Sequence, residues 1–174
     1  MSFIETPRLL IRKWMPGDAA DLSQIYGDPE TMRHIPSGPL DPEQTRAAIA
    51  KMSDDDERGE FGPWPVILKE TGKLIGECGL QYLDRTPEVE VGWVLADAVR
   101  GNGYATEAAA AVLEFGFSAL SLPRIVAIVA PENRASIAVV NRLHMWFDRV
   151  ARYYHRDFLR YHLDRPSNHG LESR

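Results

Sequence analysis

The sequence predicts a single domain of mixed α/β class, and three observations support this prediction. Runs rich in β-branched and aromatic residues alternate along the chain with segments that carry apolar residues at helical spacing. The chain of 174 residues contains no repeat and no linker, and a domain of this length buries about 70% of its unfolded surface. A glycine-rich turn past the middle of the chain joins a strand to an alanine-rich helix.

The first part of the chain is expected to form a strand followed by two helices. The strand covers residues 9–14, and a Pro-Gly-Asp sequence ends it and opens a helix over 19–26. Residues 27–40 form either a plain connection or a flexible wall over a pocket. Asp41 caps the next helix, which has proline at its first position and ends near residue 52.

A loop and a hairpin are expected to come next. Residues 53–62 are interpreted as a second loop beside the pocket, and their acidic run 54–57 is either a solvated helix end or a patch that attracts a cationic substrate. The segments 64–69 and 73–80 flank Glu70-Thr71-Gly72 and predict an antiparallel hairpin.

The rest of the chain is expected to alternate strands with helices and to end in a disordered polar tail. The predicted strands are 88–95, 124–130, 147–154 and 157–164, the helices are 105–120 and 133–143, and the tail is 166–174. The domain therefore covers residues 1–165.

Composition narrows the classes of partner. A formal net charge of −5, with 44% apolar and 26% charged residues, argues against a nucleic-acid-binding protein. The single Cys78 and an N-terminus without a signal pattern favour a cytoplasmic location, and no apolar run approaches the ~20 residues of a membrane span. His155 and His162 have no neighbouring cysteine pair, so no metal site is expected.

The glycine-rich segment 99–107 is interpreted as a diphosphate-binding loop. Gly101 and Gly103 allow positive φ, and the helix that follows directs its first unpaired N–H groups and its positive dipole end at the same place. A Walker loop would need Lys-Ser or Lys-Thr where Tyr104-Ala105 stand, and a dinucleotide fingerprint would need a small residue in place of Thr106. A plain strand-to-helix turn is the alternative.

Arg100, Gly103 and Ala105 form an Arg-x-x-Gly-x-Ala pattern that resembles the pyrophosphate signature of the GNAT superfamily of acetyl-CoA-dependent N-acetyltransferases. The resemblance continues in 6–12, Thr-Pro-Arg-Leu-Leu-Ile-Arg, and in 133–136, Asn-Arg-Ala-Ser. It looks most like the branch that acetylates N-terminal amines of ribosomal proteins, which also contains enzymes for antibiotics and other small amines. The implied fold is a mostly antiparallel sheet of about seven strands, splayed in its middle by the coenzyme, with helices on both faces.

The resemblance implies acetyl-CoA as co-substrate and suggests the residues that bind it. The pantetheine arm would run along the backbone of Val94 and Leu95, and the Val94 N–H would polarise the thioester carbonyl. Asn133 would orient the coenzyme, and Asn141 would reach the pantetheine. The residues expected to bind the diphosphate are Arg100, Gly101, Asn102, Gly103, Tyr104, Ala105 and Thr106.

Acetyl transfer also needs a neutral amine. An amine with a pKa near ~10.4 is about three units from its neutral form at pH 7, a handicap of roughly 4 kcal/mol that a general base can remove. Glu90 is the first candidate for this base, because it shares a strand face with Gly92 near the expected thioester. An ion-pairing or exposed carboxylate is the structural alternative for Glu90, and its rivals as base are Glu77, Glu88 and the Tyr82 hydroxyl.

Ser136 is matched by the resemblance to the donor of a hydrogen bond to the departing sulfur, although Asn133 and Ser136 also suit a plain helix N-terminus. Tyr104 and either Tyr153 or Tyr154 are candidates to line the pocket. Cys78 is expected to be a buried, inert thiol and not an acyl-carrying nucleophile. His144 stands where the family usually has glycine, so either it ends its helix with positive φ at a cost of about 1 kcal/mol or the helix ends differently.

The predicted function is direct transfer of an acetyl group from acetyl-CoA to a primary amine, on a protein N-terminus or on a small molecule, in a ternary complex. A homodimer is compatible with this function. The alternatives are a non-catalytic acyl-CoA-binding or sensing domain and a nucleotide phosphate binder.

Overall fold

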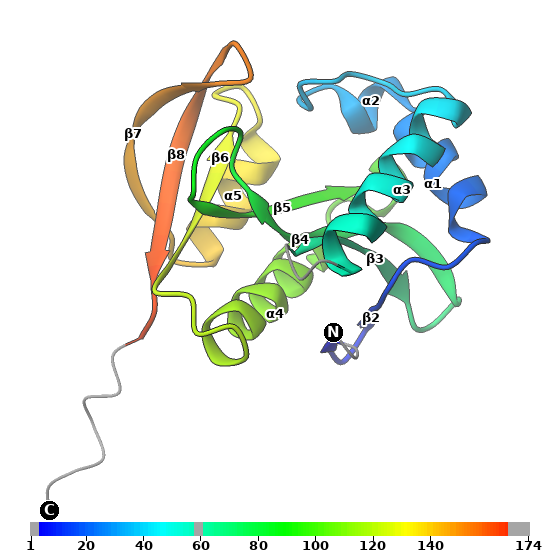
Figure 1. Cartoon of the computed structure of the whole chain (residues 1–174), viewed down its shortest axis with the longest axis horizontal. Helices are drawn as coiled ribbons and strands as arrows, with labels where there is room; N and C mark the ends of the chain where they lie inside the picture. The colour runs from blue at the N-terminus through cyan, green and yellow to red at the C-terminus, as the bar shows by residue number, and fades with distance from the viewer. Residues whose placement is uncertain (1–3, 58–60, 167–174) are drawn as a thin grey trace, which may run out of the picture.

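The computed structural model describes residues 4–57 and 61–166, which form one sheet with helices on both faces (Figure 1). The sheet has eight strands, in the order β1 (Ile4–Glu5), β2 (Leu9–Ile11), β3 (Gly62–Leu68), β4 (Lys73–Tyr82), β5 (Val89–Leu95), β6 (Arg124–Val129), β8 (Arg156–Asp164) and β7 (Trp146–Tyr153). Only the pair β5–β6 is parallel, so the predicted mixed, mostly antiparallel fold is confirmed.

The N-terminal elements differ from the prediction in three places. The strand β1 and the short helix α2 were not predicted, and the helix α3 continues to Glu57, so residues 53–57 are helical and not a loop. Asp28 starts α2, because its carboxylate accepts a hydrogen bond from the Thr31 N–H at 3.0 Å. The elements are β1 (Ile4–Glu5), β2 (Leu9–Ile11), α1 (Asp18–Tyr26), α2 (Pro29–Met32), α3 (Pro42–Glu57), β3 (Gly62–Leu68) and β4 (Lys73–Tyr82).

The C-terminal strands and α-helices match the prediction to within a few residues, and a 3₁₀ turn that was not predicted follows the first of these strands. They are β5 (Val89–Leu95), the 3₁₀ turn η1 (Asp97–Val99), α4 (Tyr104–Ser118), β6 (Arg124–Val129), α5 (Arg134–Arg142), β7 (Trp146–Tyr153) and β8 (Arg156–Asp164). The predicted tail, apart from Pro166, lies outside the described residues.

His144 ends α5 in the left-handed conformation, with φ 55°. The Met145 N–H donates to the Val140 carbonyl at 3.0 Å, and the His144 N–H donates to the Asn141 carbonyl at 3.1 Å. This pair of hydrogen bonds is the Schellman motif, in which glycine is usual at the His144 position. Histidine therefore ends the helix as glycine would, and the exit geometry is retained.

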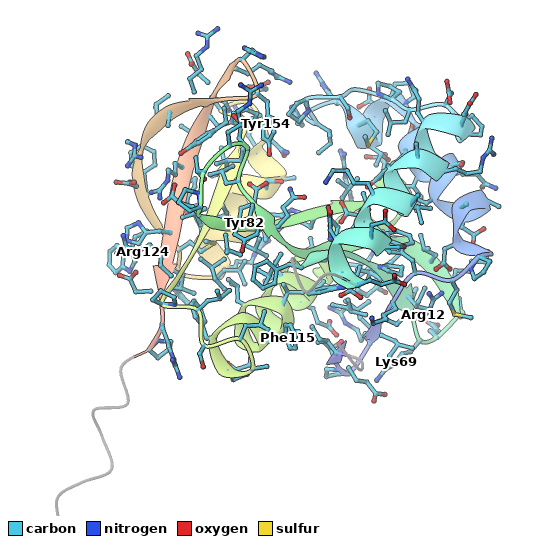
Figure 2. All side chains as sticks on the ribbon, viewed as in Figure 1. Arg12, Lys69, Tyr82, Phe115, Arg124 and Tyr154 are labelled. Carbon is cyan, nitrogen blue, oxygen red and sulfur yellow. The ribbon has the colours of Figure 1, made fainter. Side chains whose placement is uncertain are left out.

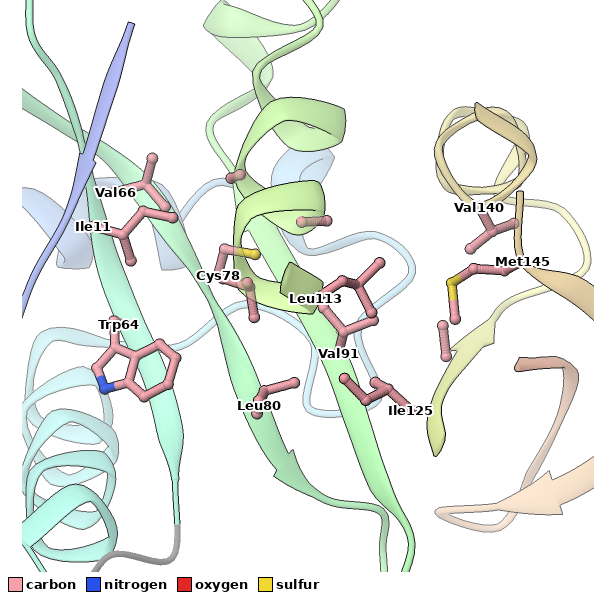
Figure 3. Packing of buried hydrophobic residues seen from close by; sticks show 14 of the residues in the cluster. Ile11, Trp64, Val66, Cys78, Leu80, Val91, Leu113, Ile125, Val140 and Met145 are labelled. Atoms are coloured by element: carbon pink, nitrogen blue, oxygen red, sulfur yellow. The ribbon is translucent and has the colours of Figure 1, made fainter. Parts of the chain in front are cut away.

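Two apolar layers place helices on opposite faces of the sheet. On one face, α4 packs on the centre of the sheet through residues such as Leu113, close to Cys78, Leu80 and Val91 of β4 and β5 (Figure 3). On the other face, the α1 residue Leu22 belongs to a separate cluster with Leu74. Because side chains alternate along a strand, neighbouring residues of β4 and β5 face different layers.

The sheet is splayed between β5 and β6. These strands pair at a single register position, Glu90 with Val126, whereas β6 continues to pair with β8 along its whole length, Arg124 to Val129. In Figure 1 β5 runs toward the side that carries α1–α3, while β6, β7 and β8 form the other side. The part of β5 beyond Glu90 therefore has an unpaired edge toward β6, which confirms the predicted opening.

Within residues 4–57 and 61–166, no helix is long and apolar enough to cross a membrane.

Candidate active site

A cavity of about 1120 Å³ lies at the splay and is lined by both halves of the sheet, by α1, α2, α3 and α5, and by the loop before α4. This volume is slightly above the range of roughly 300–1,000 Å³ that is usual for small-molecule and cofactor sites. Its polar lining includes Tyr26, His34, Glu77, Gln81, Glu90, Arg100, Tyr104, Thr106, Glu107, Asn133, Ser136, Arg142 and Tyr154.

The glycine-rich loop forms one end of the cavity. Gly101 and Gly103 both have positive φ, 82° and 78°. A Cβ on Gly101 would meet no atom within 4 Å, so the space beside this residue is open. The Asn102 amide points back into the loop and donates to the carbonyls of Val99 at 3.1 Å and Arg100 at 3.3 Å. Asn102 therefore holds the loop together and is absent from the cavity lining.

The N-terminus of α4 presents unpaired donors at the same end. The first hydrogen bond within the helix runs from the Glu107 N–H to the Gly103 carbonyl at 3.0 Å. The N–H groups of the helical residues before Glu107 therefore have no acceptor within the helix. The Thr106 hydroxyl is buried and has no hydrogen-bond partner among the described residues. A buried donor without a partner, beside a helix N-terminus and an open glycine, fits a bound anionic group.

Arg100 is less available than the sequence suggests. Its guanidinium pairs with Asp97 at 2.8 Å and donates to the Glu30 carbonyl at 3.1 Å, which ties the loop to α2. Its side chain is half-exposed and still lines the cavity.

The pairing of β4 with β5 decides which N–H groups of β5 face the gap. The Leu83 N–H donates to the Glu88 carbonyl and the Ala96 N–H donates to the Ile75 carbonyl, both at 2.9 Å. Between these two hydrogen bonds, the residue pairs of β4 and β5 continue in one register. In antiparallel strands, hydrogen-bonded pairs alternate with pairs that are not hydrogen-bonded, so the Glu77–Val94 pair is a hydrogen-bonded one. The backbone of Val94 therefore faces β4, and this corrects the expectation that its N–H faces the thioester. The gap-facing groups belong to Trp93 and Leu95.

Two buried carboxyl groups lie on the cavity wall that faces α1. Glu77 of β4 and Glu90 of β5 are 5% and 4% exposed. The Tyr26 hydroxyl donates to Glu77 at 3.4 Å, and the Gln81 amide donates to Glu90 at 2.6 Å. The other oxygen of Glu77 is buried without a hydrogen-bond partner in the described part of the chain.

Burial raises the pKa of both groups. It raises the pKa of Glu77 to about 8, with a further rise from the charge of Glu90, although the Tyr26 hydrogen bond opposes it. Burial raises the pKa of Glu90 to about 7. The hydrogen bond from Gln81 acts to lower this pKa, and the negative charge of Asp84 acts to raise it. Both carboxyls therefore exchange protons near neutral pH.

The other candidates for the general base differ from Glu90 in whether they line the cavity. Glu88 pairs with the buried Arg160 and is absent from the cavity lining. Tyr82 is 46% exposed and is also absent from that lining. Cys78 is buried in the layer under α4, where burial and the charge of Glu77 raise the pKa of its thiol. Only Glu77 and Glu90 of these candidates lie on the wall.

Some of the other predicted site residues line the cavity and others do not. Tyr104 and Tyr154 line the cavity, whereas Tyr153 belongs to an apolar cluster of β6 and β8. Ser136 also lines the cavity, and its N–H donates to the Asn133 carboxamide oxygen at 3.1 Å. The helix-capping interpretation of these two residues is therefore confirmed. Asn141 is exposed and is absent from the lining.

Three contributors were missed from the sequence. Gln81 follows directly after the predicted strand 73–80, and the antiparallel pairing of β4 with β5 places it opposite Glu90. Tyr26 and Arg8 carry no local signal of a site. Tyr26 reaches Glu77 from α1, and Arg8 reaches the glycine-rich loop from the segment before β2.

Replacing Glu77 by glutamine is expected to stabilise the protein in alkaline solution. In the unfolded chain the carboxyl ionises near pH 4.5, but in the folded protein it ionises at about 8, so wild-type stability falls as pH rises between these values. Above pH 8 the gain for Glu77→Gln should be on the order of a few kcal/mol, and below pH 4.5 this ionisation term should vanish. Urea denaturation at pH 5 and pH 9 measures it, and an equal effect at both pH values would contradict this account.

Among residues 4–57 and 61–166, no group of three or more His, Cys, Asp or Glu side chains could hold a metal ion.

Comparison with known proteins agrees with this architecture. Residues 8–146 match the family described as the acetyltransferase (GNAT) domain. A Bacillus licheniformis protein named "Uncharacterized N-acetyltransferase p20" is 35% identical over 156 residues, 88% of each chain. The acetyltransferase from Agrobacterium tumefaciens str. C58 has a TM-score of 0.83 at 30% identity and 94% coverage of each chain. RimJ from Mycobacterium smegmatis, solved in complex with CoA-disulfide, has the same fold, with a TM-score of 0.77 at 21% identity and coverage of 90% of this chain and 81% of that one.

These matches identify the chain as an acyltransferase. The chain belongs to the GNAT acetyltransferase family and is an enzyme of that class.

Proposed function

We propose that the protein transfers an acetyl group from acetyl-CoA to a primary amine by direct attack in a ternary complex. The observation that carries this proposal is the continuous cavity at the splay, which joins an anion-binding loop to two buried carboxyls. Direct transfer is supported by the position of Cys78, because the chain's single cysteine lies under α4 with a raised thiol pKa.

The loop before α4 is the proposed diphosphate site. The N–H groups of Gly103, Tyr104 and Ala105, with the Thr106 hydroxyl, offer donors at a helix N-terminus. CoA binding by the M. smegmatis RimJ structure supports the assignment of CoA to this fold. When bound, the coenzyme supplies the acetyl group as a thioester.

The unpaired edge of β5 is proposed to hold the pantetheine arm. The backbone groups that face the gap belong to Trp93 and Leu95. These are alternate residues, and an extended ligand that pairs with a strand edge bonds to alternate residues of that strand. We assign the donor that polarises the thioester carbonyl to one of these two N–H groups. Ser136, whose backbone is fixed by the Asn133 cap, is assigned the hydrogen bond to the coenzyme sulfur.

Glu90 is proposed as the general base. A carboxyl with a pKa of about 7 is substantially ionised at neutral pH and can accept a proton from the incoming ammonium group. The hydrogen bond from Gln81 fixes the orientation of its carboxylate. Glu77, whose pKa is about 8, is proposed to remain mainly protonated and to shape the pocket beside it.

The acceptor is proposed to enter between α2, α3 and the β7–β8 turn. Met32, Ile35, Leu40 and Met52 give this end apolar walls, and Tyr154 lies at the turn (Figure 2). The acceptor amine belongs to a protein N-terminus or to a small molecule, and a screen decides between them.

The test is thiol release from acetyl-CoA with N-terminal peptides, polyamines, amino acids and aminoglycosides, followed by mass spectrometry of the amine. We expect acceptor-dependent thiol release and a mass gain of one acetyl group on one class of amine. Tight CoA binding without turnover across the panel would favour the sensing domain. Greater thermal stabilisation by ATP than by CoA would favour a nucleotide site and overturn the proposal.

A further inference from the structure

We infer that Arg8 is a positioning residue for the phosphate loop, acting by cancelling the charge of Glu107 and by holding the loop backbone. The inference rests on the proposed function, since it concerns the diphosphate of the coenzyme. Arg8 lies in the segment between β1 and β2, far from the loop in sequence.

Glu107 in the first turn of α4 is the centre of these contacts. One carboxylate oxygen accepts from the Thr6 hydroxyl at 2.6 Å and from the Arg8 N–H at 3.0 Å. The other accepts from the Arg8 Nε at 2.6 Å. Three donors from one short segment therefore converge on one carboxylate.

Arg8 also contacts the loop itself. Its Nη1 donates to the Asn102 carbonyl at 2.8 Å, between the two glycines with positive φ. Its guanidinium stacks over the Tyr104 ring at 4.5 Å, and its Nη2 lies 3.6 Å from where a Cβ on Gly103 would stand. One side chain thus contacts Asn102 and Tyr104 and borders Gly103 between them.

The electrostatics explain why the loop needs this arginine. Glu107 lines the cavity, and although burial acts to raise its pKa, the hydrogen bonds from Thr6 and Arg8 lower it below its usual value. It is therefore ionised at neutral pH and would repel a diphosphate at the same helix N-terminus. The Arg8 guanidinium removes that repulsion.

The experiment compares acetyl-CoA with S-acetylpantetheine, which carries the same thioester without phosphates. For Arg8→Met, we expect the KM for acetyl-CoA and the Kd for CoA to rise about tenfold or more, with kcat changed less than about threefold. The KM for S-acetylpantetheine should stay at the wild-type value.

Two further variants separate charge from folding. Adding Glu107→Gln to Arg8→Met removes both charges and should recover most of the CoA affinity. Arg124→Met is the matched control, because Arg124 is also half-exposed and pairs with Asp164 at 2.5 Å at the far side of the molecule (Figure 2). It should leave both KM values unchanged.

The outcomes distinguish this inference from the proposed function. If the wild-type protein does not bind CoA, the proposed function fails. If it binds CoA and Arg8→Met binds equally well, Arg8 has no positioning role. An equal rise in KM for both thioesters would show a general structural defect and overturn the inference. No recovery in the double variant would overturn the charge-cancelling role of Arg8.

Discussion

Glu90→Gln is expected to lower kcat by about 10²- to 10⁴-fold, the usual contribution of a general base. Glutamine has the same shape and can still accept the hydrogen bond from Gln81, so the fold and the Kd for CoA should be retained. Steady-state kinetics with the acceptor found in the screen, together with calorimetric titration of CoA, measures both effects. Unchanged turnover would remove Glu90 from the mechanism.

The pH profile provides an independent check of the same assignment. The ionised carboxylate is the active form, so wild-type kcat/KM should rise with pH and level off above an inflection near 7. Glu90→Gln should lose that inflection. Glu77→Gln, which changes the neighbouring buried carboxyl, serves as the control and should keep it. The opposite pattern would assign the base to Glu77.

Gly79→Ala is expected to have the largest effect on stability. An alanine Cβ at this position would stand 2.3 Å from the Gly62 carbonyl oxygen and 2.6 Å from the Pro63 Cα. Both are backbone atoms of the paired strand β3, which cannot move aside cheaply. We expect a loss of about 3 kcal/mol or more and a Tm lower by about 6 to 12 °C, measured by thermal and urea denaturation.

Gly92→Ala is the matched control for this prediction. Gly92 is the direct register partner of Gly79 on β5, yet its Cβ would meet only the Gln81 amide at 3.9 Å. Neither glycine has positive φ, so backbone strain does not separate them. Gly92→Ala should therefore keep wild-type stability within about 0.5 kcal/mol. Equal destabilisation by both substitutions would contradict the close approach of β3 to Gly79.

Local chemistry explains which features were predictable. Some features depend only on residues a few positions apart, so they could be predicted from the sequence. These are the strand and helix periods, the positive φ of the glycines at 101 and 103, and the Asn133 cap. His144 belongs here too, since a helix end depends on its last turn alone. Helix α2 was missed because its four residues are too few to show a period.

Contacts between residues that are distant in the chain determine the burial and the backbone orientation of the candidate site residues. Burial distinguishes Glu90 from Glu88: Glu90 is buried on β5 beside Gln81 of β4, whereas Glu88, just before β5, is partly exposed and pairs with Arg160. Pairing with β4 turns Val94 away from the gap.

The sequence by itself determined most of the strands and helices, the glycine-rich turn before α4 and the family, because each is encoded in short segments whose spacing is preserved on folding. Only the tertiary structure decided which carboxyl is buried, which backbone edge is unpaired, and that Arg8 pairs with Glu107, 99 positions along the chain. These depend on the distances and solvent exclusion that arise when remote segments pack together.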